Sequence, residues 1–141
     1  MTERDSEVER VARRLTGKNA LIEAVETARE FGTQQWLSKE ELARLCILVE
    51  EWVANLYDHG SVSTSDVIEI ELEADKDGLL LTITDPGKSF DPRHLPIDFV
   101  RTEGGAGAGI DLMKAWANVV SYDIGPRGNR LRLLFPVGWG E

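Results

Sequence analysis

Three polar side chains, Glu51, Asn55 and His59, follow one another at four-residue steps in the stretch LCILVEEWVANLYDHG, residues 45–60. In a helix each step turns the side chain by only about 40°, so all three would share one edge, beside the apolar face rather than opposite it. On that edge a carboxylate could act as a general base, and an amide oxygen one turn later could bind a hard cation such as Mg²⁺. The alternative is a solvated glutamate, a tolerated asparagine and a histidine favoured near a helix C-terminus. The spacing alone leaves both interpretations open.

A carboxylate also ends an apolar strand, in the stretch ITDPGKSFDP. Asp85 is followed by Pro86 and Gly87, which predict a turn, so its side chain would stand at the end of a sheet with backbone room beside it. A ligand could exchange hydrogen bonds with Asp85 there, although the same residues also make an ordinary turn.

A glycine-rich run, EGGAGAGIDLMKAW, leads directly onto a predicted helix; its glycines are Gly104, Gly105, Gly107 and Gly109. Free backbone N–H groups and the positive end of the helix dipole favour an anion such as phosphate, whereas Asp111, expected in the first turn, adds a negative charge. Two familiar phosphate motifs fail. The dinucleotide fingerprint needs a glycine where Ile110 stands, and the P-loop needs a lysine there and a hydroxyl residue at 111.

The elements that must position these residues follow from the hydrophobic periodicity. The first is a helix over 19–31 that Gly32 ends, and the second is a helix opened by a capping box of Ser38 and Glu41 and closed by Gly60. A hairpin over 66–85 follows, and then a long irregular loop over 86–107. The chain continues with a short helix over about 108–118 and ends with two strands, VVSYDI and RLRLLFP. On the first helix Leu21, Ile22, Val25, Ala28 and Phe31 form one apolar stripe, which is compatible with an exposed face or with a core face. Residues 1–18 fit either an edge strand or a loose helical arm. This order of helices and largely antiparallel strands predicts an α/β (α+β) protein, a two-layer α/β sandwich.

Length and composition limit the function. A chain of 141 residues with 42% hydrophobic side chains predicts one domain with a single core. A formal charge of −9 would repel a phosphate backbone, so nucleic acid is not an expected partner, whereas a basic protein surface is compatible. No run of 18 apolar residues and no secretory signal is visible, which predicts a cytoplasmic protein without a membrane anchor. The one cysteine, Cys46, lies among apolar residues and is expected to be a core side chain.

Taken together, E-x-x-x-N ending a helix, D-x-G after a hairpin strand and G-x-G-x-G before a helix resemble the GHKL, or Bergerat-fold, ATPases. Within that superfamily the chain is similar to the anti-sigma-factor serine/threonine protein kinases, whose branch carries E-x-x-x-N-x-x-x-H-G, present here as EEWVANLYDHG. The resemblance covers about residues 19–136. It implies a single histidine-kinase-like ATPase domain over 1–141, with a mixed, largely antiparallel sheet and helices on one face.

The resemblance implies a role for each matching residue. Glu51 matches the catalytic base, Asn55 the Mg²⁺ ligand, and Asp85 the residue that hydrogen-bonds the adenine amino group of ATP, with Gly87 giving the base room. The phosphate-facing part of a lid over ATP is matched by Gly105, Gly107 and Gly109. The implied activity is transfer of the γ-phosphoryl group of ATP to a serine of an anti-sigma-factor antagonist, by a protein that also binds a sigma factor. A homodimer is a further implication.

Some residues depart from the family pattern. Ser89 stands where a second glycine is common in D-x-G-x-G, and Asn129 where a threonine is common, which predicts altered adenine contacts. No lysine or arginine lies within 102–113, so a cationic phosphate contact would have to come from Lys88, Arg101 or Lys114. Three functions therefore stay open: a working serine kinase, a nucleotide-binding regulatory module with little or no kinase activity, and a protein-interaction domain that has lost the ligand.

Overall fold

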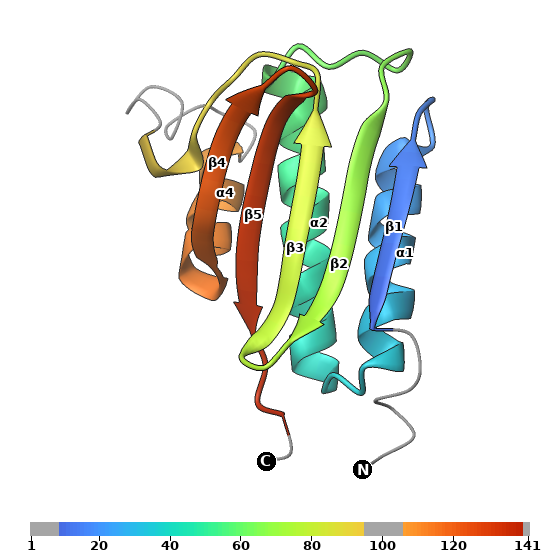
Figure 1. Cartoon of the computed structure of the whole chain (residues 1–141), viewed down its shortest axis with the longest axis vertical. Helices are drawn as coiled ribbons and strands as arrows, with labels where there is room; N and C mark the ends of the chain where they lie inside the picture. The colour runs from blue at the N-terminus through green and yellow to red at the C-terminus, as the bar shows by residue number, and fades with distance from the viewer. Residues whose placement is uncertain (1–8, 95–105, 140–141) are drawn as a thin grey trace.

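The structure, a computed structural model, describes residues 9–94 and 106–139 and shows a five-stranded sheet with helices packed on one face (Figure 1). Along the chain the elements are β1 (Arg10–Leu15), α1 (Ala20–Gln34), α2 (Lys39–His59), β2 (Ile68–Asp75), β3 (Gly78–Asp85), the 3-10 helix η2 (Pro92–His94), α4 (Ala106–Trp116), β4 (Asn118–Gly125) and β5 (Gly128–Pro136). The predicted two-layer α/β sandwich is confirmed. Within the described ranges, every helix is too short or too polar to cross a bilayer.

The sheet has the strand order β1-β2-β3-β5-β4. Each pairing of neighbours is antiparallel, so between the described strands the sheet is wholly antiparallel rather than mixed. Ile70 lies opposite Ile83, which lies opposite Leu131, and all three are buried on the face that carries the helices. On the other face Arg10 pairs with Glu71 at 2.6 Å. Strand β1 also settles the two alternatives for the N-terminal segment, because it forms an edge strand, while residues 1–8 lie outside the described ranges.

Helix α2 begins and ends as predicted. The Ser38 hydroxyl accepts a hydrogen bond from the Glu41 N–H at 3.1 Å, and the Glu41 carboxylate accepts one from the Ser38 N–H at 2.9 Å, which completes the capping box. Gly60 is the C-cap. The helix buries its apolar face against the sheet; its buried residues include Leu45, Cys46, Leu48, Val49, Trp52, Val53 and Leu56. Cys46 is thus the core side chain that was expected.

Helix α1 corrects one prediction and decides between two alternatives. It does not end at Gly32 but continues to Gln34, with Gly32 buried in its last turn. A Cβ at Gly32 would lie 2.7 Å from Leu42 Cδ1, the end of a flexible side chain, so Gly32 lies where α1 approaches α2 closely and not at a helix stop. The apolar stripe belongs mostly to the core, because Ala28 and Phe31 are buried and Leu21 and Val25 pack against the core while partly buried. Ile22 is the exception, at 58% exposed, and Ala20 and Ala24 complete the buried face.

Helix α4 begins two residues earlier than predicted and corrects the position of Asp111. Because the helix starts at Ala106, Asp111 lies in its second turn and not beside the N-terminal N–H groups. The repulsion that Asp111 was expected to exert on an anion at the helix N-terminus is therefore weaker than the sequence suggested. The predicted loop after β3 contains the short helix η2, and its segment 95–105 lies outside the described residues.

Candidate functional site

The C-terminal ends of α2 and β3 meet at one end of the sandwich, where the turn between β4 and β5 also lies (Figure 1). The Lys88 N–H donates to the Gly60 carbonyl oxygen at 2.6 Å, which holds the turn after β3 against the end of α2. A Cβ at Gly87 would lie 2.1 Å from the same oxygen and 2.7 Å from Val62 Cγ2. Gly87 is therefore required for contact between the turn and α2, a reason that the sequence pattern did not reveal. Its expected role of giving a nucleobase room stays a prediction.

Asn55 carries a buried oxygen atom that lacks a hydrogen-bond donor. The side chain is 2% exposed, and its Nδ2 donates to the Glu51 carbonyl oxygen at 2.6 Å, which fixes the orientation of the amide. Among the described residues, Asn55 Oδ1 has no hydrogen-bond partner. Leaving a buried acceptor unpaired costs about 1–3 kcal/mol, so this oxygen is suited to a ligand that supplies positive charge.

The chemistry of this oxygen fits Mg²⁺. Magnesium prefers hard oxygen ligands, keeps several of its waters and is usually bound by one or two protein oxygens together with substrate phosphates. The described part of the chain contains no cluster of three or more His, Cys, Asp or Glu side chains that could form a complete protein cage. Asn55 is thus a residue that could hold Mg²⁺ next to a phosphorylated substrate.

Glu51 lies one turn before Asn55 on the same edge of α2. Its side chain is half-buried, and burial, followed by repulsion from Glu50, raises the pKa of its carboxyl. A carboxylate whose pKa is raised accepts a proton more readily near neutral pH, as a general base must. His59 follows in the last turn, also half-buried, so the predicted edge stripe of three polar side chains is confirmed.

Asp85 is the buried carboxylate at the end of β3. It is 2% exposed, and its Oδ1 accepts hydrogen bonds from the Gly87 N–H at 2.8 Å and from Asn129 Nδ2 at 3.2 Å. Burial raises the pKa of the Asp85 carboxyl, while these two hydrogen bonds oppose the rise. Asp85 Oδ2 accepts no hydrogen bond from the residues that the structure describes, so it can accept one from a ligand.

Two residues that sequence reasoning treated only as departures from the family pattern belong to this site. Asn129 lies opposite Asp85 across the β3–β5 pair, and its Nδ2 also donates to the Gly87 carbonyl oxygen at 2.9 Å. The Ser89 hydroxyl donates to Asn129 Oδ1 at 2.5 Å. The sequence offered one signal for this contact: Ser89 and Asn129 both differ from the residues that are common at these positions in the family.

The glycine-rich run is described only in part. Gly107 and Gly109 lie in the first turn of α4, whereas Gly105 lies outside the described residues. Of the proposed cationic contacts, Lys88 is an exposed residue in the turn after β3, and Lys114 lies in the last turn of α4, at the opposite end from the glycines. Arg101 lies outside the described residues. Glu51 and Asn55 therefore lie in the C-terminal half of α2, whose end meets the end of β3 that carries Asp85, and the phosphate contacts stay predictions.

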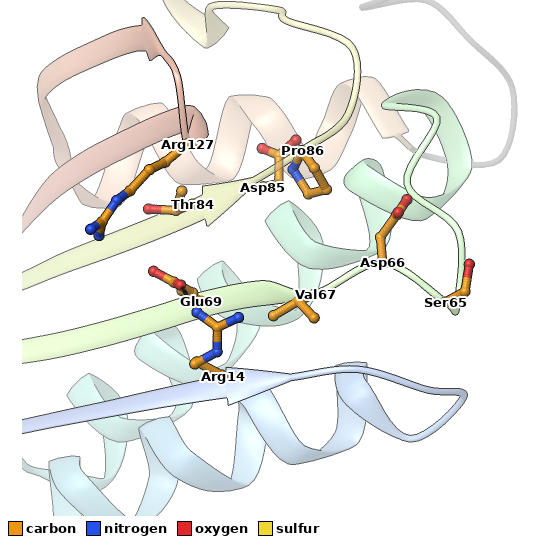
Figure 2. Close-up of a pocket in the computed structure, with 9 residues that line it drawn as sticks. All are labelled: Arg14, Ser65, Asp66, Val67, Glu69, Thr84, Asp85, Pro86 and Arg127. Atoms are coloured by element: carbon orange, nitrogen blue, oxygen red, sulfur yellow. Dashed lines mark hydrogen bonds and ion pairs between the residues drawn. The ribbon is translucent and has the colours of Figure 1, made fainter.

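A cavity of about 470 Å³ lies on the helix-free face of the sheet, beyond the rim formed by Asp85 and Pro86 (Figure 2). It is lined also by Arg14, Ser65, Asp66, Val67, Glu69, Thr84 and Arg127. Arg14 forms an ion pair with Glu69 at 2.5 Å, so charge in this cavity is largely balanced. Because side chains alternate along a strand, Thr84 faces this cavity and Asp85 faces the helices. The cavity is therefore distinct from the site that contains Asn55 and Glu51.

The comparison with known families agrees with this geometry. The family described as Histidine kinase-like ATPase domain matches residues 16–135 of the chain. That segment contains Glu51, Asn55, Asp85 and the glycine-rich run. No curated protein matches the chain.

Proposed function

Because the chain belongs to the histidine kinase-like ATPase family, whose members bind ATP, we propose that it is an ATP-dependent serine protein kinase that acts as an anti-sigma regulatory factor. It would bind a sigma factor and phosphorylate the antagonist that competes for it. The observation that carries the proposal is the unpaired, buried Oδ1 of Asn55, one helical turn from a half-buried carboxylate with a raised pKa. A buried polar atom without a partner calls for an explanation, and a bound cation would supply one for this oxygen.

The transfer that we propose uses groups of the chain in two ways. Glu51 accepts the proton of the substrate serine hydroxyl as the serine oxygen forms its bond to the γ-phosphorus, and ADP leaves with the electrons of the broken β–γ bridging bond. Asp85 accepts a hydrogen bond from the adenine amino group and so fixes the position of the nucleotide. Mg²⁺ bound through Asn55 would offset the negative charge of the phosphates. The N–H groups at the start of α4 would face the same phosphates.

Phosphoryl transfer can be tested with ATP that is radiolabelled in the γ position. The purified chain, ATP and Mg²⁺ are added to a protein extract of the cells that produce it, and labelled serines are located by mass spectrometry. We expect a labelled protein with wild type and roughly a 100-fold slower reaction with Glu51→Gln, because a general base contributes at least this factor. Glu40→Gln is the matched control, since Glu40 is an exposed glutamate in the first turn of the same helix, away from Glu51, and it should retain most of the rate.

Binding of the sigma factor is tested separately, with a purified sigma factor and the chain in the presence of ATP or ADP. Binding that depends on nucleotide, without any labelled serine, would replace the kinase by a nucleotide-binding regulatory module. Binding that ignores nucleotide would favour a protein-interaction domain. The homodimer is also a proposal, and light scattering on the purified chain measures its mass.

A further inference from the structure

A network of hydrogen bonds joins the turn after β3 to Asn129 on β5. Asp85 Oδ1 accepts from the Gly87 N–H and from Asn129 Nδ2, at 2.8 and 3.2 Å. The second N–H of the Asn129 amide donates to the Gly87 carbonyl oxygen at 2.9 Å. The amide oxygen accepts from the Ser89 hydroxyl at 2.5 Å. Every polar atom of the buried Asn129 side chain is therefore paired with this turn.

This pairing allows only one orientation of the Asn129 amide. Its nitrogen faces two acceptors, Asp85 Oδ1 and the Gly87 carbonyl oxygen, and its oxygen faces a hydroxyl donor. A rotation by half a turn would bring the amide oxygen against both acceptors and the amide nitrogen against the hydroxyl. The hydroxyl of Ser89 thus helps to fix the amide that holds Asp85, although Ser89 itself is exposed and makes no described contact with Asp85.

We propose that Ser89 and Asn129 are positioning residues, which hold Asp85 so that its free Oδ2 selects an exocyclic amino group on a purine base. This inference rests on the proposed nucleotide site and deepens it. Both N–H groups of Asn129 and the Ser89 proton are already engaged within the protein, so these side chains offer the base an acceptor and no donor. An amino group at the purine 6-position can donate to Asp85 Oδ2. A carbonyl oxygen at that position would face a carboxylate oxygen and be rejected.

The test compares ADP with inosine diphosphate, which carries a carbonyl group in place of the 6-amino group of adenine. Isothermal titration in the presence of Mg²⁺ gives the dissociation constant of each nucleotide for wild type, Ser89→Ala and Asn129→Ala. Wild type should prefer ADP. In both variants the ratio of the two constants should fall by about fivefold, the value of one ordinary hydrogen bond, because Asp85 is held less firmly. Ser89 is exposed, so its substitution should leave the fold intact, as the melting temperature will show.

A matched control and a double variant separate positioning from a general effect of substitution. Ser65→Ala removes another exposed serine hydroxyl, whose hydrogen bond to the Ser63 hydroxyl at 2.8 Å lies in the loop before β2. It should leave the ADP preference unchanged. In the double variant, Ser89→Ala should add nothing to Asn129→Ala, because the partner of the hydroxyl is already gone.

Each outcome decides between the two proposals. A preference for ADP that is unchanged in Ser89→Ala and Asn129→Ala would overturn the positioning role and leave the proposed nucleotide site in place. An equal loss of preference in Ser65→Ala would also overturn the positioning role. If wild type binds neither nucleotide, both the positioning role and the proposed function are wrong.

Discussion

Replacement of Gly87 by alanine should damage the contact that joins the two halves of the site. The new Cβ would lie 2.1 Å from the Gly60 carbonyl oxygen, whereas ordinary contacts begin at 3.4 Å, so the backbone must move by more than 1 Å. That movement would break the hydrogen bond from the Lys88 N–H to Gly60, at 2.6 Å, and strain the one from the Gly87 N–H to Asp85, at 2.8 Å. One lost hydrogen bond, one weakened hydrogen bond and an overpacked contact together amount to about 2–4 kcal/mol of unfolding free energy.

Urea unfolding followed by circular dichroism measures this loss, and two other glycines serve as controls. A Cβ at Gly125 would meet nothing within 4 Å, so Gly125→Ala should change the unfolding free energy by less than about 0.5 kcal/mol. Gly17 also has open space but a φ of +93°, so Gly17→Ala should cost about 1–2 kcal/mol through backbone strain alone. If Gly87→Ala is no more destabilising than Gly125→Ala, the close approach of the turn to α2 does not exist as described.

Three further predictions concern the buried groups. Burial raises the pKa of Asp85 above 3.8 in the folded state, so the protonated carboxyl favours folding below that pH, and this contribution is lost as the pH rises through the folded pKa. The unfolding free energy of Asp85→Asn, measured relative to wild type, should therefore increase from pH 4 to pH 7. A difference that stays constant would contradict the pKa shift. Cys46 is 7% exposed, and burial raises the pKa of its thiol. A thiol reagent should therefore modify Cys46 only as fast as the protein unfolds locally. Rapid reaction without denaturant would place Cys46 at the surface. Phe31→Ala should lower the unfolding free energy by about 3–5 kcal/mol and Ile22→Ala by less than about 0.5 kcal/mol, because Phe31 is 1% exposed and Ile22 is 58% exposed. If urea unfolding gives similar losses for the two variants, the buried face of α1 is wrong.

The parts of the fold that the sequence predicted correctly depend on contacts between neighbours in the chain. The capping box joins Ser38 to Glu41, three residues away, and the hairpin of β2 and β3 turns at adjacent residues, so local patterns contain the information. The stripe of Glu51 and Asn55 follows from the geometry of one helix in the same way.

The predictions that failed depend on packing between segments. Glycine is a frequent helix stop, but Gly32 is buried inside α1, where Leu42 on α2 approaches it closely. Helix periodicity also could not decide whether the apolar stripe of α1 lies in the core, since it does not show how closely two helices approach. Neither effect can be read from one helix alone.

In the site, too, the contacts that the sequence did not predict join segments that are far apart in the chain. The hydrogen bond between Ser89 and Asn129 joins residues 40 positions apart, and it forms because β3 pairs with β5 in the register that sets Asp85 opposite Asn129. The requirement for glycine at position 87 likewise comes from the end of α2. Composition and motifs identified these residues, but their contacts required the sheet register.

The most direct test of the nucleotide site is the thermal melting of wild type and Asn55→Ala, with ATP and Mg²⁺ added separately and together. A ligand at 100 times its dissociation constant stabilises the folded state by about 2.7 kcal/mol, which corresponds to a rise of roughly 5–10 °C for a chain of this size. Wild type should show this rise only with ATP and Mg²⁺ together, and Asn55→Ala should lack it. Wild type that melts at the same temperature under all conditions would contradict the proposal that Asn55 and Asp85 form a metal–nucleotide site.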